Sequence, residues 1–126
     1  MIDSFYYFHK NKKMEKEIAV TALAALAQDT RLDIFRYLME VGPEGAAAGK
    51  IAEHLDVPAA TLSFHLKTLQ YAGLILRRRQ SQSLIYRADF EAMAALMRYL
   101  TENCCGGRPE LCQPAMAMPQ QKMKTR

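Results

Sequence analysis

Apolar residues recur at three- and four-residue intervals along much of the chain, which is the spacing of helices with one buried face. The pattern predicts four helices in the first part of the chain, at residues 15–27, 31–41, 50–55 and 59–72. Asp29 or Thr30 is expected to cap the second helix, and Gly42-Pro43 to end it. A loop is expected over residues 44–49, and a tight turn at Asp56-Val57-Pro58 separates the last two helices.

Two short apolar runs, Leu74–Leu76 and Leu84–Tyr86, come next and predict the strands of a hairpin. The polar, basic segment between them, residues 77–83, is expected to be the loop of that hairpin. A last helix is predicted from Asp89, a good N-cap, to about Asn103. No further regular structure is expected after this helix, because glycine, proline and polar residues dominate there.

The last helix carries an apolar stripe that exceeds what one small domain needs for its own core. With Ile18, Leu23 and Leu26 of the first helix, this stripe is expected to form a dimer interface. The stripe consists of Phe90, Met93, Leu96, Met97 and Leu100.

The order helix, helix, helix-turn-helix, hairpin, helix predicts a mainly α protein with a small β-hairpin. The predicted fold is a winged helix-turn-helix that dimerises through its first and last helices. Its 126 residues suit one domain, over residues 14–105. Residues 1–13 are interpreted as a leader or extension expected to be disordered, and 106–126 as a flexible C-terminal tail carrying Cys112. A cytoplasmic location is expected, because neither a membrane span nor a secretory signal is recognisable.

Positive charge is concentrated where such a fold would touch DNA. The chain has 17 Lys and Arg against 13 Asp and Glu, and three consecutive arginines lie in the hairpin. In this layout the second helix of the pair enters the major groove. The candidate DNA contacts are Thr61, Ser63, Phe64, His65 and Lys67 on that helix, and Arg77, Arg78, Arg79 and Arg87 on the hairpin.

Several alternatives remain for these residues. Side chains alternate along a strand, so the three arginines cannot all face DNA at once. His65 contacts DNA or holds the helix in place. An ordinary solvated helix face beside a charged strand edge, or a winged domain used only for protein contacts, would show similar patterns.

The chain resembles the arsenic-repressor (ArsR/SmtB) family of winged-helix metalloregulators. Residues 63–69 and 72–74 are similar to the family's Ser-x-His-Leu-x-x-Leu and Ala/Ser-Gly-Leu motifs. Upstream, residues 26–34 are similar to its Leu-Ala-x-x-x-Arg-Leu-x-Ile. Downstream, Arg78-Arg79-Gln80 and Tyr86-Arg87 are similar to its wing, which adds Gln80 to the candidate contacts.

The resemblance covers roughly residues 20–105 and implies a homodimer that reads a two-fold symmetric operator in double-stranded DNA. The chain departs from the family at two turns. Pro58 stands where a serine usually caps the recognition helix, and Ser81 stands where the tip of the wing usually has glycine.

The three cysteines, Cys104, Cys105 and Cys112, fall within nine residues of one another. Three thiolates with no obvious fourth ligand suit As(III) or Sb(III), whereas Zn(II) prefers four. The tail also looks like that of the family's arsenic-responsive branch with a C-terminal site. The chain is therefore interpreted as an arsenite- or antimonite-responsive repressor that releases its operator when the ion binds.

Other interpretations of the cysteines remain open. In the first, the inducer is Cd(II), Pb(II) or Zn(II) instead of As(III) or Sb(III). In the second, the thiols respond to oxidation. In the third, the cysteines have no functional role. A thiol enzyme is not expected, because Arg108 lies three and four residues after the adjacent cysteines rather than in a Cys-x5-Arg loop.

Overall fold

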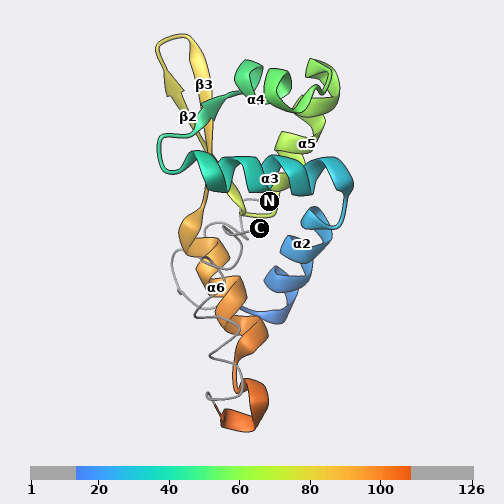
Figure 1. The fold of residues 1–126 in the computed structure, drawn as a ribbon, viewed down its shortest axis with the longest axis vertical. Coiled ribbons are helices and arrows are strands. Elements are labelled where there is room, and N and C mark those ends of the chain that lie inside the picture. The colour runs from blue at the N-terminus through green and yellow to red at the C-terminus, as the bar shows by residue number, and fades with distance from the viewer. Residues whose placement is uncertain (1–13, 109–126) are drawn as a thin grey trace, which may run out of the picture.

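A computed structural model of the chain describes residues 14–108, so the expected extension and most of the tail, with Cys112, lie outside the described residues. The chain is mainly helical, with a small antiparallel sheet of order β1-β3-β2. The helices are α2 (Lys16–Leu26), α3 (Asp29–Val41), α4 (Ala48–Leu55), α5 (Ala59–Tyr71) and α6 (Phe90–Thr101), and a 3-10 turn spans Cys104–Gly107 (Figure 1). The strands are β1 (Ala46–Ala47), β2 (Ile75–Gln80) and β3 (Ser83–Ala88).

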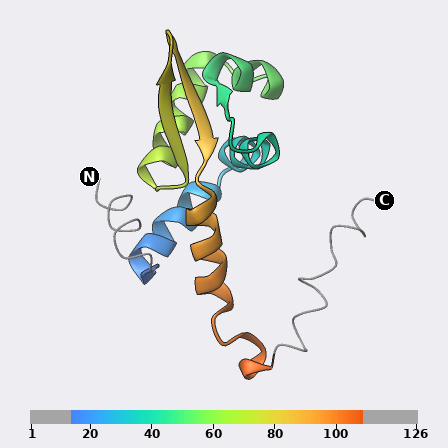
Figure 2. The same ribbon diagram turned by 90° about the vertical axis from the view of Figure 1, so that its left-hand side faces the viewer.

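The elements divide the molecule into two ends along its long axis. Helices α4 and α5 and the β2–β3 hairpin lie at one end, and α3 crosses beneath them (Figure 1). Helix α6 extends away from this group to the other end, with α2 beside its first part, and the 3-10 turn lies at its far tip (Figure 2). Of the helices over residues 14–108, none is long and apolar enough to cross a membrane.

The core forms where α3 and α5 pack together and against the hairpin. The inward side chains of α5 are Leu62, Leu66 and Leu69, whose spacings of four and three residues place them on one helix face. They meet Ile34 and Leu38 of α3, which are fully buried. The apolar periodicity therefore predicted the buried face of α5 correctly, and with it the face that remains free.

The N-termini of α6 and α3 are capped by different kinds of side chain. Asp89 caps α6 as predicted, since its Oδ1 accepts a hydrogen bond from the Ala92 amide at 3.1 Å. For α3 the predicted caps are wrong. Gln28, with an extended backbone, accepts a hydrogen bond from the Arg31 amide at 2.8 Å, and Asp29 already lies inside the helix.

The segment predicted as a loop, residues 44–49, contains strand β1 and the start of α4, which begins two residues earlier than expected. Ala46 pairs with Tyr86 and Ala47 with Ile85. Two alanines carry no strand signal of their own, so only the neighbouring edge of β3 decides this pairing. Gly45 makes the approach possible, because a Cβ there would lie 2.5 Å from the Tyr86 carbonyl oxygen and its φ is +73°.

The hairpin loop was also predicted too long. Strands β2 and β3 stay paired up to Gln80 and Ser83, so the three arginines lie in β2 and only two residues form the turn. The backbone ladder does not depend on side-chain polarity, so a basic sequence can continue it. Ser81 has φ +59°, a conformation that glycine adopts most easily, which accounts for the glycine that the family usually has at this position.

The apolar stripe of α6 does not act as one surface. Leu96 is only 2% exposed and belongs to the core of its own protomer, so its predicted place at a dimer interface is wrong. Phe90 and Met93 are half-buried against the same core. Met97 and Leu100 are 45% and 52% exposed and remain available to a partner.

Candidate nucleic-acid interface

The turn between α4 and α5 orients the two helices. Asp56 ends α4 in the left-handed conformation, with φ 56° and ψ 51°, which Asp tolerates better than most residues. The amide of Val57 donates to the Ala52 carbonyl at 3.0 Å and closes the turn. Pro58 then stands at the N-cap of α5 and supplies no side-chain hydrogen bond, so the first amides of α5 are left for solvent or for another partner.

The outer face of α5 is small and polar around one large apolar side chain. The exposed positions are Ala59, Ala60, Thr61, Ser63, Phe64 and Lys67. Phe64 is 65% exposed, although its neighbours Leu62 and Leu66 on the helix are buried. A helix of this composition can approach the edges of bases closely, and Phe and Ala suit the methyl group of thymine.

His65 differs from the other predicted contacts on α5. Its side chain is only 8% exposed, and its Nδ1 lies 3.4 Å from Nη1 of Arg31. A guanidinium only donates, so Nδ1 accepts and the proton of the neutral ring is on Nε2. Burial, and next the charge of Arg31, lower the pKa of His65. The side chain therefore lies on the inner side of α5, which supports the second of its two predicted roles, holding the helix in place.

Arg31 joins this histidine to the first helix. Its Nε donates to the Ala25 carbonyl near the end of α2 at 2.6 Å, and its Nη1 faces His65. One side chain of α3 thus connects α2 with α5. Sequence reasoning recognised Arg31 only as part of a motif and missed this connection, because the residues lie 34 positions apart.

The wing presents its arginines on two faces. Arg77 and Arg79 alternate with Arg78 along β2, so the prediction that the three cannot share one face is confirmed. All three are exposed, as is Gln80, and Arg87 on β3 is half-buried. Arg78 Nη2 donates at 3.1 Å both to the Glu44 carbonyl and to Gln80 Oε1, so it also ties the wing to the loop before β1.

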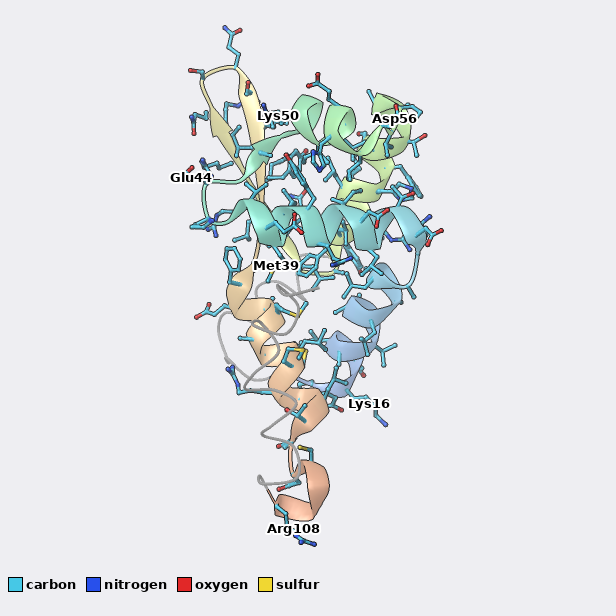
Figure 3. All side chains as sticks on the ribbon, in the orientation of Figure 1. Lys16, Met39, Glu44, Lys50, Asp56 and Arg108 are labelled. Carbon is cyan, nitrogen blue, oxygen red and sulfur yellow. The ribbon has the colours of Figure 1, made fainter. Side chains whose placement is uncertain are left out.

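Lys50 is a further candidate contact that the sequence reasoning missed. It is exposed in the first turn of α4 and lies at the same end of the molecule as the hairpin (Figure 3). In helix-turn-helix proteins the first helix of the pair crosses the DNA backbone, where a lysine suits a phosphate. Its position in the motif is a signal that could have identified it.

The predicted cysteine site is described only in part. Cys104 and Cys105 share the 3-10 turn after α6, Cys104 is half-buried, and Cys112 is outside the described residues. Asn103 and Gly106 flank the pair with φ 59° and 63°, a conformation that lets the chain reverse direction. Residues 14–108 contain no cluster of three His, Cys, Asp or Glu placed to hold a metal ion. The three-thiolate site therefore stays a prediction.

Comparisons with known proteins agree with this architecture. The helix-turn-helix domain family matches residues 26–78. The HTH-type transcriptional regulator YceK of Bacillus subtilis is 33% identical over 63% of this chain and 78% of its own length. YceK is named as a transcriptional regulator, which agrees with the expectation from the sequence that this chain is not a thiol enzyme.

Solved structures show the same fold. An ArsR-like transcriptional regulator from Rhodococcus sp. RHA1 is 25% identical, with a TM-score of 0.62, over 81% of this chain and 96% of that protein. The homodimeric winged helix-turn-helix DNA-binding domain of Mb0332 from Mycobacterium bovis, a possible ArsR-family regulator, is 25% identical with a TM-score of 0.55. That match covers 73% of this chain and 85% of Mb0332. The predicted winged helix-turn-helix class is confirmed.

Proposed function

The chain belongs to the ArsR-family helix-turn-helix transcriptional regulators, and on this premise we propose that it is a dimeric repressor of a two-fold symmetric operator. The observation that carries the proposal is the outer face of α5. It is small and polar, with Ser63 and Thr61 beside the exposed Phe64, and its inner face is locked into the core. A helix held in this way can enter a major groove without losing protomer contacts.

In the proposed complex, base contacts and phosphate contacts come from different elements. Thr61, Ser63 and Phe64 read base edges, whereas Lys67 and Lys50 bind phosphates. The wing adds Arg77, Arg78, Arg79, Gln80 and Arg87, which contact phosphates or reach into the minor groove. We propose that the protein acts in the cytoplasm, where a repressor of this kind meets its operator.

Dimerisation would use the exposed apolar residues at the other end of the molecule. Leu23 of α2 is 40% exposed, and Met97 and Leu100 of α6 are similarly accessible. Two copies joined through these residues would present two α5 helices to half-sites about 34 Å apart. A Leu100→Glu change should produce monomers with an intact fold in analytical ultracentrifugation, because Leu100 is outside the protomer core.

The test of DNA recognition is selection of duplexes from a random pool, followed by fluorescence anisotropy at several salt concentrations. We expect nanomolar-to-micromolar binding of a palindromic site that weakens steeply with salt, because arginine and lysine release counterions from phosphates. Absence of any selected site would contradict the proposal.

Phe64 allows a sharper test on the selected operator. Replacing single thymines by uracil removes only a methyl group, and at one or two positions we expect about tenfold weaker binding. Phe64→Ala should bind thymine and uracil operators equally well, while Thr61→Ala as the matched control keeps the difference. Equal sensitivity to uracil in both variants would show that Phe64 reads no methyl group.

For the inducer, we propose As(III) or Sb(III) held by Cys104, Cys105 and Cys112. Two observations support this proposal: three thiolates without an obvious fourth ligand suit these ions, and two of the cysteines lie in the chain just after the proposed dimer surface. These two cysteines are consecutive in the turn that follows α6, the helix that carries Met97 and Leu100. Drawing these thiols toward Cys112 would reshape that end of the dimer surface and change the separation of the two α5 helices. A shift in occupancy from about 99% to 1% needs about 5.5 kcal/mol of differential affinity, shared between the two protomers.

The inducer test is release of the operator by arsenite, antimonite, cadmium and zinc under reducing conditions. Replacing any one of the three cysteines by serine should leave operator binding intact and greatly reduce release by arsenite. Release by cadmium or zinc alone would identify another ion, and release only by an oxidant would favour a redox response. A triple-serine variant still released at the wild-type arsenite concentration would exclude this site.

A further inference from the structure

A hollow of about 330 Å³ lies between α2 and α5, away from the outer face of α5 that is proposed to read DNA. Helix α2 contributes Val20, Thr21 and Ala24, and α5 contributes Thr68 and Tyr71. Helix α3 adds Arg31. The volume is within the usual range of small-molecule sites, and apolar walls with a few polar groups are typical of them.

Arg31 is the one cation of the described lining, and much of its hydrogen-bonding capacity is unused there. A guanidinium has five N–H donors. Among residues 14–108, Nε donates to the Ala25 carbonyl and Nη1 faces His65, which leaves three N–H donors for a ligand. A half-buried guanidinium in an apolar hollow favours an anion with planar oxygens, which it can bind in bidentate fashion.

The same side chain is the connection between two functional helices. Through Ala25 it touches α2, which carries Leu23 on the proposed dimer surface. Through His65 it touches the inner side of α5. A ligand that draws on Arg31 therefore acts on the joint that positions the recognition helix relative to the dimer surface.

We propose that this hollow binds a small amphipathic carboxylate, and that its occupation changes the affinity for the operator. The apolar part of the ligand lies against Val20, Ala24 and Tyr71, and its carboxylate lies against Arg31. The effect on DNA rests on the proposed function, whereas binding of the carboxylate does not. By linkage, operator DNA changes the affinity for the carboxylate by the same factor.

The first experiment is calorimetric titration of the full chain, without DNA, with benzoate and with benzamide. The two probes have nearly the same shape and differ in charge. We expect benzoate to bind with a dissociation constant of about 1 mM or tighter, and benzamide at least about tenfold more weakly. No binding of benzoate, phenylacetate or hexanoate at about 10 mM would overturn the proposal, as would equal binding of benzoate and benzamide.

Two alanines provide a matched pair of variants. Ala24→Leu fills part of the hollow while Arg31 itself is retained, and it should abolish benzoate binding while leaving operator binding intact. Ala27→Leu adds the same side chain at an exposed position just after α2, outside the lining, and should bind benzoate like the wild type. Unchanged benzoate binding by Ala24→Leu would place the probe elsewhere and overturn the proposed site.

The second experiment repeats the operator titration with saturating benzoate. We expect the operator affinity of the wild type to change at least about fivefold, and that of Ala24→Leu to stay the same. Benzoate binding without any effect on the operator would overturn the regulatory half of the proposal. Benzoate affinity that falls as the protein concentration rises would show that a second copy occupies the hollow instead. Failure to bind any DNA would contradict the proposed function, yet would leave the calorimetric result valid.

Discussion

Helix α5 and the end of α6 both carry candidate functional side chains, but the protomer holds them very differently. On α5, Leu66 and Leu69 are buried on the same face and His65 is held by Arg31, so the outer face has a defined direction. On α6, Leu96 is the last buried residue and Leu100 is exposed. The 3-10 turn Cys104–Gly107 follows and lies at the far tip of the molecule (Figure 1). A reading surface fixed by the core is thus combined with an exposed apolar surface that the protomer itself does not cover.

The largest effect should come from matched leucine substitutions in these two regions. Leu69→Ala removes a fully buried side chain and should lower the free energy of unfolding by about 2–5 kcal/mol. Leu100→Ala removes a side chain that is 52% exposed and should cost less than about 1 kcal/mol in the monomer. Urea denaturation at several protein concentrations measures both. If Leu100→Ala becomes more destabilising at high concentration, the α6 surface is buried between copies.

A pair of glycines tests how firmly the wing is anchored beside α5. Gly45→Ala should destabilise the fold by about 1–3 kcal/mol, because φ is +73° and the new Cβ would meet the Tyr86 carbonyl. Gly49→Ala, in α4 with nothing within 4 Å of the new Cβ, should be neutral or stabilising by up to about 1 kcal/mol. Thermal denaturation would show the contrast, and equal effects of both changes would contradict the close approach of β1 to β3.

Removing wing charge should weaken DNA binding without affecting the cysteine end. The double change Arg78→Ala and Arg79→Ala should reduce the affinity for DNA about tenfold for all sequences. The slope of the logarithm of the binding constant against the logarithm of the salt concentration should become shallower by about 2. Arg78 also donates a hydrogen bond to the Glu44 carbonyl, so its removal can affect the structure of the wing as well as its charge. The single change Arg79→Ala removes one positive charge and leaves that hydrogen bond in place. Cys104→Ser should leave affinity unchanged. An unaltered salt slope in the double variant would show that the wing does not contact phosphates.

The smallest effect concerns the pH dependence of stability at the Arg31–His65 contact. The pKa of His65 is lowered in the folded state, so the unfolded chain binds the proton first as the pH falls. Stability from this group is therefore complete above pH 6.5 and decreases as the pH falls below that value. His65→Gln should show a weaker dependence than the wild type in urea denaturation at pH 7.5 and 5.5. Thr61→Ala, at an exposed position without a titratable side chain, is the control and should retain the full dependence.

The sequence by itself determined the order of the helices, the buried face of α5 and the wing that follows it. Apolar spacing, turn residues and the basic run each act over a few neighbouring positions, so a linear pattern records them. The family resemblance followed from the same local motifs. Of the predicted DNA contacts on α5, the structure leaves Thr61, Ser63, Phe64 and Lys67 exposed.

Only the tertiary structure decided what depends on distant partners. The strand at Ala46-Ala47 exists because the edge of β3 is available, and the inward position of His65 depends on Arg31, 34 residues earlier. Leu96 and Leu100 look alike in an apolar stripe, yet one enters the core and the other stays exposed. Such choices are set by which surfaces meet once the chain is folded, and hydrophobic spacing along one helix does not contain that information.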